Sequence, residues 1–210
     1  MTQRGKSYKK NFFKTKKHEL VYASYHEAGH AIYTLLKSFC INDVFISDKK
    51  RVCGLVNWIS IEYSPLSKQL ILDEIKILNA GLASEYIYYE KMTGNNNYPS
   101  FLKKESGDDL FVASSLIKQY NLSQPGKKRL LLKKKIFKDV LFDLNYNWDA
   151  VTLIAKALLV KRKLSYLDIQ NILIKKSKNK KFWKYQFKKI DYIFNNLSIL
   201  DKKDLMDILK

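Results

Sequence analysis

The chain has 210 residues, enough for one domain with a substantial core, and 46% of its residues are hydrophobic. It carries 39 Lys and Arg against 20 Asp and Glu, a formal net charge of +19, which favours nucleic acid, an anionic membrane surface or an acidic protein as a partner. Lys, Asn, Ile and Tyr are all abundant, however, and an AT-rich genome alone produces that pattern. Two cysteines are too few for a disulfide framework, and no apolar run approaches the roughly 18 residues of a membrane span.

Residues 1–18 form a basic N-terminal tail, with seven Lys or Arg and no acidic residue in the first seventeen positions. No long apolar segment follows, so we do not expect a secretory signal. We expect Cys40 and Cys53 to be reduced and mostly buried, because their spacing suits neither a disulfide framework nor a metal site. These features indicate a cytoplasmic or similarly reducing compartment.

Apolar residues at helical spacing predict a first helix from Glu19 to about Phe39. Next come "DVFIS" and "RVCGLVNWISI", two segments rich in β-branched and aromatic residues, which predict a hairpin. Ser64 and Pro65 resemble a helix start, and that second helix should run to about Met92.

The turn-rich stretch "TGNNNYPSFLKKESG" predicts a mobile loop. Helices are then expected over about 106–120, 127–145 and 148–162, and Ser165 with Asp168 forms a capping box that starts one more short helix. The lysine-rich segment 175–210 is a change in composition that suggests a basic, helical C-terminal extension, which leaves residues 19–174 as the main domain.

The stretch "YHEAGH" places His26 and His30 four residues apart on the first predicted helix. Residues at this spacing share a helix face, so both imidazoles can bind one zinc ion. Glu27 is close enough to take a proton from a zinc-bound water without binding the metal. The alternative is a chance match on an amphipathic helix, but this chain has only three histidines.

Catalytic zinc needs a third protein ligand. His18 is a poor candidate, because it precedes His26 by about two turns, roughly 12 Å along the helix axis. A carboxylate from a later segment is the remaining choice.

The string "ASYHEAGHAIYTLL" resembles the start of the peptidase domain in the FtsH family of ATP-dependent zinc metalloproteases. The similarity continues through the hairpin at 43–58, "NAGLASEYIYYEKMTG", "SGDDLFVASSLIKQY" and "IAKALLVKRKLSYLDIQNIL", and it spans about Val21 to Leu173. The resemblance implies a mainly α fold: a helical zinc-peptidase domain with one small β-hairpin beside the active-site helix.

The resemblance implies that His26, His30 and Asp109 bind Zn²⁺ and that Glu27 is the general base. Asp108 could replace Asp109, which could instead cap a helix together with Ser106. Glu85 matches a family glutamate that would hydrogen-bond a ligating imidazole; alternatively it is an exposed surface residue.

Two features depart from the family. Leu82 stands where the family usually has Arg, so its surroundings must repack. The second departure is that the sequence shows no ATPase module. Gly5, Lys6 and Ser7 resemble the end of a phosphate-binding loop, but the earlier glycine and the preceding strand that such a loop needs are missing. We therefore expect a free-standing, ATP-independent peptidase that cleaves extended or unfolded polypeptide, or one that uses a separate ATPase or unfoldase.

We expect the substrate to pair as a strand with Gly54, Leu55 and Val56, although this strand could equally be a plain hairpin edge. A different class of function rests on charge: "KKRLLLKKK" and "KKFWKYQFKK" could combine phosphate contacts with base stacking. In that case the chain would be an inactive peptidase scaffold that binds nucleic acid or an anionic surface, or an adaptor that docks on an acidic ATPase.

Overall fold

The structure is a computed structural model that describes residues 16–48, 53–59, 67–97, 107–123 and 125–196. In these residues the fold is mainly α with one small antiparallel sheet, as the sequence predicts. The helices are α2 (Lys16–Leu36), α3 (Lys68–Thr93), α4 (Gly107–Gln119), α5 (Lys127–Tyr146), α6 (Trp148–Lys161), α7 (Tyr166–Lys176) and α8 (Lys180–Asn195). The strands are β1 (Cys40–Ser47), β2 (Cys53–Ile59) and β3 (Lys163–Ser165).

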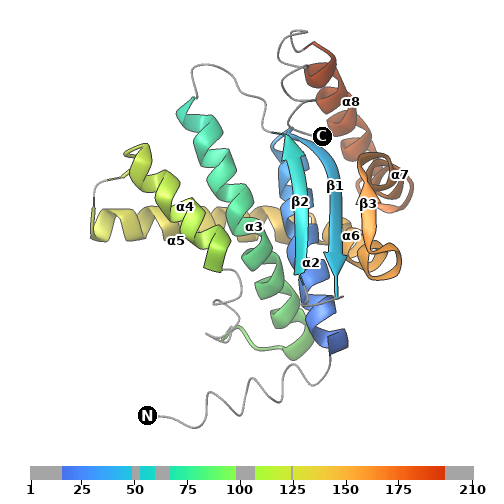
Figure 1. Cartoon of the computed structure of the whole chain (residues 1–210), viewed down its shortest axis with the longest axis horizontal. Coiled ribbons are helices and arrows are strands. Elements are labelled where there is room, and N and C mark those ends of the chain that lie inside the picture. The colour runs from blue at the N-terminus through green and yellow to red at the C-terminus, as the bar shows by residue number, and fades with distance from the viewer. Residues whose placement is uncertain (1–15, 49–52, 60–66, 98–106, 124, 197–210) are drawn as a thin grey trace.

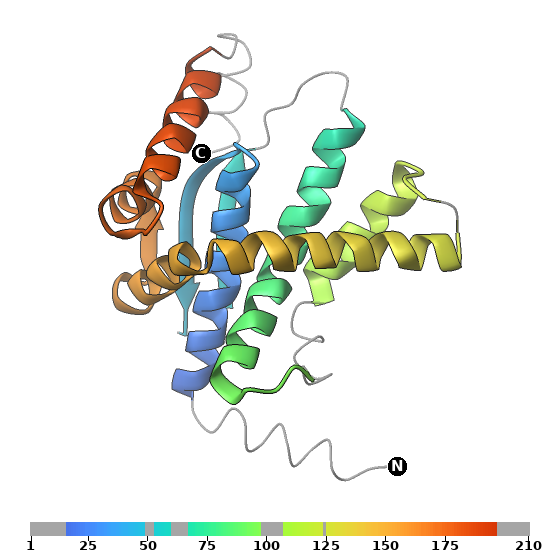
Figure 2. The ribbon, with the colours of Figure 1, turned by 180° about the vertical axis from the view of Figure 1, so that it is seen from behind.

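Helix α2 lies at the centre of the fold (Figure 1). The sheet covers one side of it, and α3 runs alongside it. On the side away from the sheet, α5 crosses α3 and α6 packs against α2, both in front of these helices in Figure 2. An apolar helix face enclosed in this way loses most of its contact with water, and that burial is the main source of its stability.

Gly29 allows α2 and α3 to pack closely. A Cβ atom on residue 29 would lie 2.5 Å from the carbonyl oxygen of Ala80 and 2.5 Å from the Cβ atom of Ser84. Glycine inside a helix costs about 1 kcal/mol relative to alanine, and here it provides the room in which the α3 backbone approaches the histidine-bearing helix.

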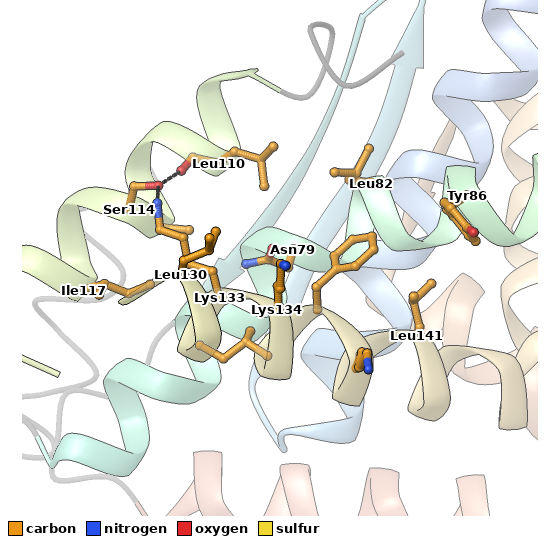
Figure 3. A pocket seen from close by; sticks show the side chains of 14 residues that line it. Asn79, Leu82, Tyr86, Leu110, Ser114, Ile117, Leu130, Lys133, Lys134 and Leu141 are labelled. Atoms are coloured by element: carbon orange, nitrogen blue, oxygen red, sulfur yellow. Dashed lines mark hydrogen bonds between the residues drawn. The ribbon is translucent and has the colours of Figure 1, made fainter. Parts of the chain in front are cut away.

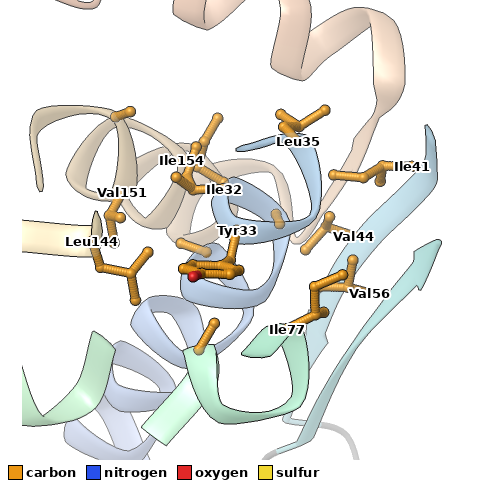
Figure 4. Close-up of a cluster of buried hydrophobic side chains, with 14 of the residues drawn as sticks. Ile32, Tyr33, Leu35, Ile41, Val44, Val56, Ile77, Leu144, Val151 and Ile154 are labelled. Atoms are coloured by element: carbon orange, nitrogen blue, oxygen red, sulfur yellow. The ribbon is translucent and has the colours of Figure 1, made fainter. Parts of the chain in front are cut away.

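Side chains from both the helices and the sheet meet in a single hydrophobic core (Figure 4). The labelled residues of this cluster are Ile32, Tyr33, Leu35, Ile41, Val44, Val56, Ile77, Leu144, Val151 and Ile154. Burying one such aliphatic side chain contributes roughly 1.5–3 kcal/mol. The same contacts hold the hairpin and α3 against α2, and so they position the site.

The hairpin predicted at 43–58 is present and pairs β1 with β2 in antiparallel register, with Val44 opposite Val56. The sheet has a third strand that the sequence analysis did not anticipate, because β3 contains only three residues. It pairs with β1 on the side away from β2, so the strand order is β2-β1-β3.

Most predicted helix boundaries agree with the structure to within a few residues. The first helix ends at Leu36 rather than Phe39, because Ser38 takes up a left-handed conformation with φ of 64°. Helix α3 begins at Lys68, where Ser67 caps it by accepting a hydrogen bond from the Leu70 N–H. Ser64 and Pro65 lie outside the described residues, as do most of the N-terminal tail and residues 98–106 of the predicted loop. The capping box of Ser165 is confirmed.

Helix α8, within the expected C-terminal extension, packs on the same core as the rest of the domain. Trp183 is fully buried, Phe187 and Ile190 are each 1% exposed, and the Gln186 side chain donates hydrogen bonds to the Leu35 carbonyl and to Ser38 Oγ. Across the described ranges, no helix combines the length and apolar character needed to cross a bilayer.

Candidate metal centre

Three potential metal ligands from distant parts of the sequence converge at one point. His26 and His30 project from the same face of α2, and their Nε2 atoms lie 3.0 Å apart. Oδ2 of Asp109, in the first turn of α4, lies 3.1 Å from His26 Nε2 and 3.3 Å from His30 Nε2. Within the described part of the chain, these three residues form the one group of three or more His, Cys, Asp or Glu side chains that could hold a metal ion.

The other nitrogen of each imidazole is already engaged. His30 Nδ1 lies 2.8 Å from the carbonyl oxygen of Ile77, which can only accept a hydrogen bond, so this nitrogen carries the proton. His26 Nδ1 lies 2.8 Å from Oε1 of Glu85 and donates to it in the same way. In the neutral form of both rings, each Nε2 therefore directs a lone pair towards the Asp109 carboxylate.

Such a group of electron-rich atoms requires a positive charge at its centre. Burial disfavours a charged His26, but hydrogen bonds with Asp109 and Glu85 outweigh this and raise the pKa of His26 well above its usual value. Burial also acts to raise the pKa of Asp109, yet hydrogen bonds with the two imidazoles lower it below its usual value. Both shifts favour a cation at this place, which a proton or a metal ion can supply.

The separations suit zinc. Zinc binds His nitrogen and carboxylate oxygen at about 2.0–2.1 Å with tetrahedral geometry, which places the ligand atoms about 3.3 Å apart. The three observed separations, 3.0, 3.1 and 3.3 Å, are close to that value. Two His and one Asp also leave a fourth position, as in catalytic rather than structural zinc sites.

Gly81 on α3 makes room for this cluster, a role that the sequence analysis did not identify. A Cβ atom on residue 81 would meet Nε2 of both His26 and His30. The only signal available in the sequence was a glycine inside a long predicted helix, where it costs about 1 kcal/mol without a packing reason.

Glu27 lies beside the cluster without belonging to it. It is 6% exposed, and burial raises its pKa above the usual value, against the opposing effect of the two nearby imidazoles. Gly54 on β2 faces this side chain, because a Cβ atom there would lie 2.6 Å from Glu27 Oε1. The hairpin therefore covers the glutamate with backbone alone at this position.

The structure separates the alternatives that the sequence left open. Asp108 is exposed and outside the cluster, whereas Asp109 lies within it. His18 is also exposed and outside the cluster. Glu85 is 6% exposed, so the alternative of an exposed surface glutamate is wrong.

Strand β2 is an edge strand of the sheet, and no strand among the described residues pairs with its outer side. Leu55 is 48% exposed, while Val56 is buried in the core. A peptide at this edge could therefore contact the side chain of Leu55 but only the backbone of Val56.

The aromatic residues of α8 are poorly placed for base stacking. Of the aromatics in "KKFWKYQFKK", Trp183 and Phe187 are buried, and only Phe182 and Tyr185 are exposed. Base stacking by this segment would therefore have to use Phe182 and Tyr185, because the hydrophobic core contains the other two rings.

Comparison of the chain with protein-family models gives no match, and comparison with curated proteins gives none either.

Proposed function

We propose that this protein is a zinc-dependent endopeptidase with His26, His30 and Asp109 as the metal ligands. The observation that carries the proposal is the convergence of two Nε2 lone pairs and one carboxylate at 3.0–3.3 Å, with Glu27 buried beside them. The resemblance to FtsH-type peptidases supports the same assignment through the same residues.

His26, His30 and Asp109 would hold the zinc ion, which would supply Lewis acidity that makes water more acidic and a peptide carbonyl more electrophilic. Glu27 accepts a proton from the attacking water and later donates it to the amine that leaves. Glu85 and the Ile77 carbonyl hold the two imidazoles in the tautomer that directs Nε2 to the metal.

The open edge of β2 supports an extended polypeptide as the substrate, because an added strand satisfies its main-chain hydrogen bonds along that edge. Gly54, Leu55 and Val56 would then position the scissile bond near Glu27. Hydrolysis at this centre needs no nucleotide, so cleavage of a stably folded substrate would require a separate ATPase or unfoldase.

We also propose a cytoplasmic or other reducing compartment, because two cysteines are too few for a disulfide framework. Cys40 is a free thiol, and its burial raises its pKa to about 11. A thiol with such a pKa stays protonated and unreactive at neutral pH.

The direct test is hydrolysis of a disordered protein such as casein, with zinc, with chelator and with zinc restored. We expect activity only with metal. Glu27→Gln should bind zinc as the wild type does but lose about 10²–10⁴-fold in rate, whereas Glu90→Gln, at an exposed glutamate of α3, should remain active. Equal hydrolysis with and without chelator, or a fully active Glu27→Gln, would contradict the proposal.

Binding of nucleic acid or an anionic surface is the alternative function, and the exposed lysines of α5 are what favours it. Such binding should weaken steeply as salt rises, whereas hydrolysis at zinc should not. A gel-shift titration at two salt concentrations separates the two functions.

A further inference from the structure

A cavity of about 570 Å³ lies between α3, α4 and α5 (Figure 3). Both α4 and α5 pack against α3, and the cavity occupies the space between them. Neither the three proposed metal ligands nor Glu27 lines it. The cavity therefore has a lining distinct from the candidate metal centre, although Leu110 in that lining directly follows Asp109 in the chain.

The interior of the cavity is apolar. Four of its lining residues are almost fully buried: Leu82 is 5% exposed, Ala113 4%, Ile117 1% and Ile136 3%. Ligand pockets in proteins have volumes of roughly 300–1,000 Å³ and mostly apolar walls with a few polar groups. Both the size and the lining of this cavity match that description.

The charged groups that line the cavity are all lysines of α5, while Asn79, Tyr86 and Ser114 add neutral polar groups from α3 and α4. Lys133, Lys134 and Lys138 line it, and Lys133 Nζ reaches across to donate a hydrogen bond of 2.7 Å to Ser114 Oγ on α4 (Figure 3). None of the three lysines pairs with a carboxylate among the described residues.

The nearest acids on α5 are engaged elsewhere. Asp139 pairs with Lys76, and Asp143 accepts a hydrogen bond from the Tyr33 hydroxyl. The lysines of the cavity thus keep their positive charge uncompensated beside an apolar interior.

We propose that this cavity binds a single-chain amphiphile with an anionic head group, a carboxylate or a phosphate. The chain would lie against Leu82, Ile117 and Ile136, where it removes apolar surface from water. The head group would accept hydrogen bonds from Lys133 and its neighbours, which are strengthened by charge. A small polar anion would leave the apolar walls wet, and a neutral apolar molecule would leave the lysines without a partner.

The test is calorimetric titration of the whole chain with dodecanoate and, separately, with dodecyl phosphate, both below their micelle concentrations. We expect saturable binding of one molecule per chain, and the tighter of the two probes identifies the head group. Dodecanol, with the same chain and no charge, should bind at least about tenfold more weakly.

Variants locate the binding. Lys133→Gln should lower the affinity about tenfold to a hundredfold, and Leu130→Glu should lower it by placing a negative charge at a half-exposed wall position. Ala113→Phe should abolish binding by filling the interior; because it is a core change, its fold is first checked by circular dichroism. Lys175→Gln, on the exposed end of α7, is the charge-matched control and should bind as the wild type does.

Two results would overturn the assignment. One is the absence of saturable binding of either anionic probe to folded wild-type protein. The other is binding that Lys133→Gln and Leu130→Glu leave unchanged, or that Lys175→Gln weakens as much as Lys133→Gln, because either pattern would mean that the probe does not occupy this cavity.

Discussion

Gly54 of β2 lies against the side chain of Glu27 on α2, so closely that a side chain of any size on residue 54 would displace the carboxylate. Glycine at this position therefore leaves room for the Glu27 side chain, which we propose as the general base. The edge strand proposed to receive the substrate therefore approaches the proposed general base at Gly54.

For Gly54→Ala we accordingly expect a loss of hydrolytic rate with metal binding preserved. A shift of about 1 Å in a reacting group costs roughly 10²-fold in rate, and the added methyl group forces a shift of that order. The measurement is the casein hydrolysis rate together with zinc content. Gly94→Ala, at the C-terminal end of α3 with open space around it, is the matched control. A fully active Gly54→Ala would show that hydrolysis does not depend on the close fit between Gly54 and Glu27.

Gly81→Ala should instead destroy the metal site. The new methyl group would occupy the space directly against Nε2 of both histidines. We expect loss of bound zinc, measured by metal analysis after dialysis, and loss of the stabilisation against heat that zinc gives the wild-type protein. Gly94→Ala should lose some stability through its φ of 66° but keep its zinc. Full zinc occupancy in folded Gly81→Ala would contradict this prediction.

Asp109→Asn should weaken zinc binding more than any change in the hydrogen-bonding partners of the histidines. Its Oδ2 lies within 3.3 Å of both Nε2 atoms, and an amide is a poor zinc ligand. Asp108→Asn is the neighbouring control, and its zinc affinity should match that of the wild type because Asp108 is exposed. Competition with a zinc-binding dye gives both affinities, and the reverse order would make Asp108 the ligand.

Glu85→Gln keeps an oxygen that can accept the His26 Nδ1–H but removes its negative charge. Losing such a partner of a ligating histidine typically costs about 10–100-fold in metal affinity. We expect a loss in that range from the same dye competition. Glu90→Gln, an exposed glutamate on the same helix, should bind zinc as the wild type does; equal affinities of the two variants would leave Glu85 without this role.

Trp183→Ala tests whether α8 is part of the domain. Trp183 is fully buried, so truncation should lower the free energy of unfolding by about 3–5 kcal/mol. Tyr185, on the same helix, is 67% exposed, and Tyr185→Ala should change the free energy of unfolding by less than about 0.5 kcal/mol. Urea denaturation compares the two, and similar small effects would show that α8 contributes little to the core.

The sequence alone predicted the features that depend on residues close together in the chain. The spacing of four positions from His26 to His30 places both on one helix face. The β-branched and aromatic residues of the hairpin and the capping box at Ser165 are likewise recognised within a few positions of the chain. The individual helices and the hairpin followed from the same local patterns, and the resemblance implied the mainly α fold that they form. These relationships persist whatever the rest of the molecule does, because they are properties of a helix or a strand.

Only the tertiary structure decided which distant residues meet. It brought Asp109 rather than Asp108 to the histidines, and the Ile77 carbonyl and Gly81 to the same point. It also buried Trp183, which the sequence presented as one of several aromatics among lysines. Such outcomes depend on how α3, α4 and α8 pack on α2, and packing is set by the shape of whole helix surfaces, which the spacing of residues along the chain does not specify.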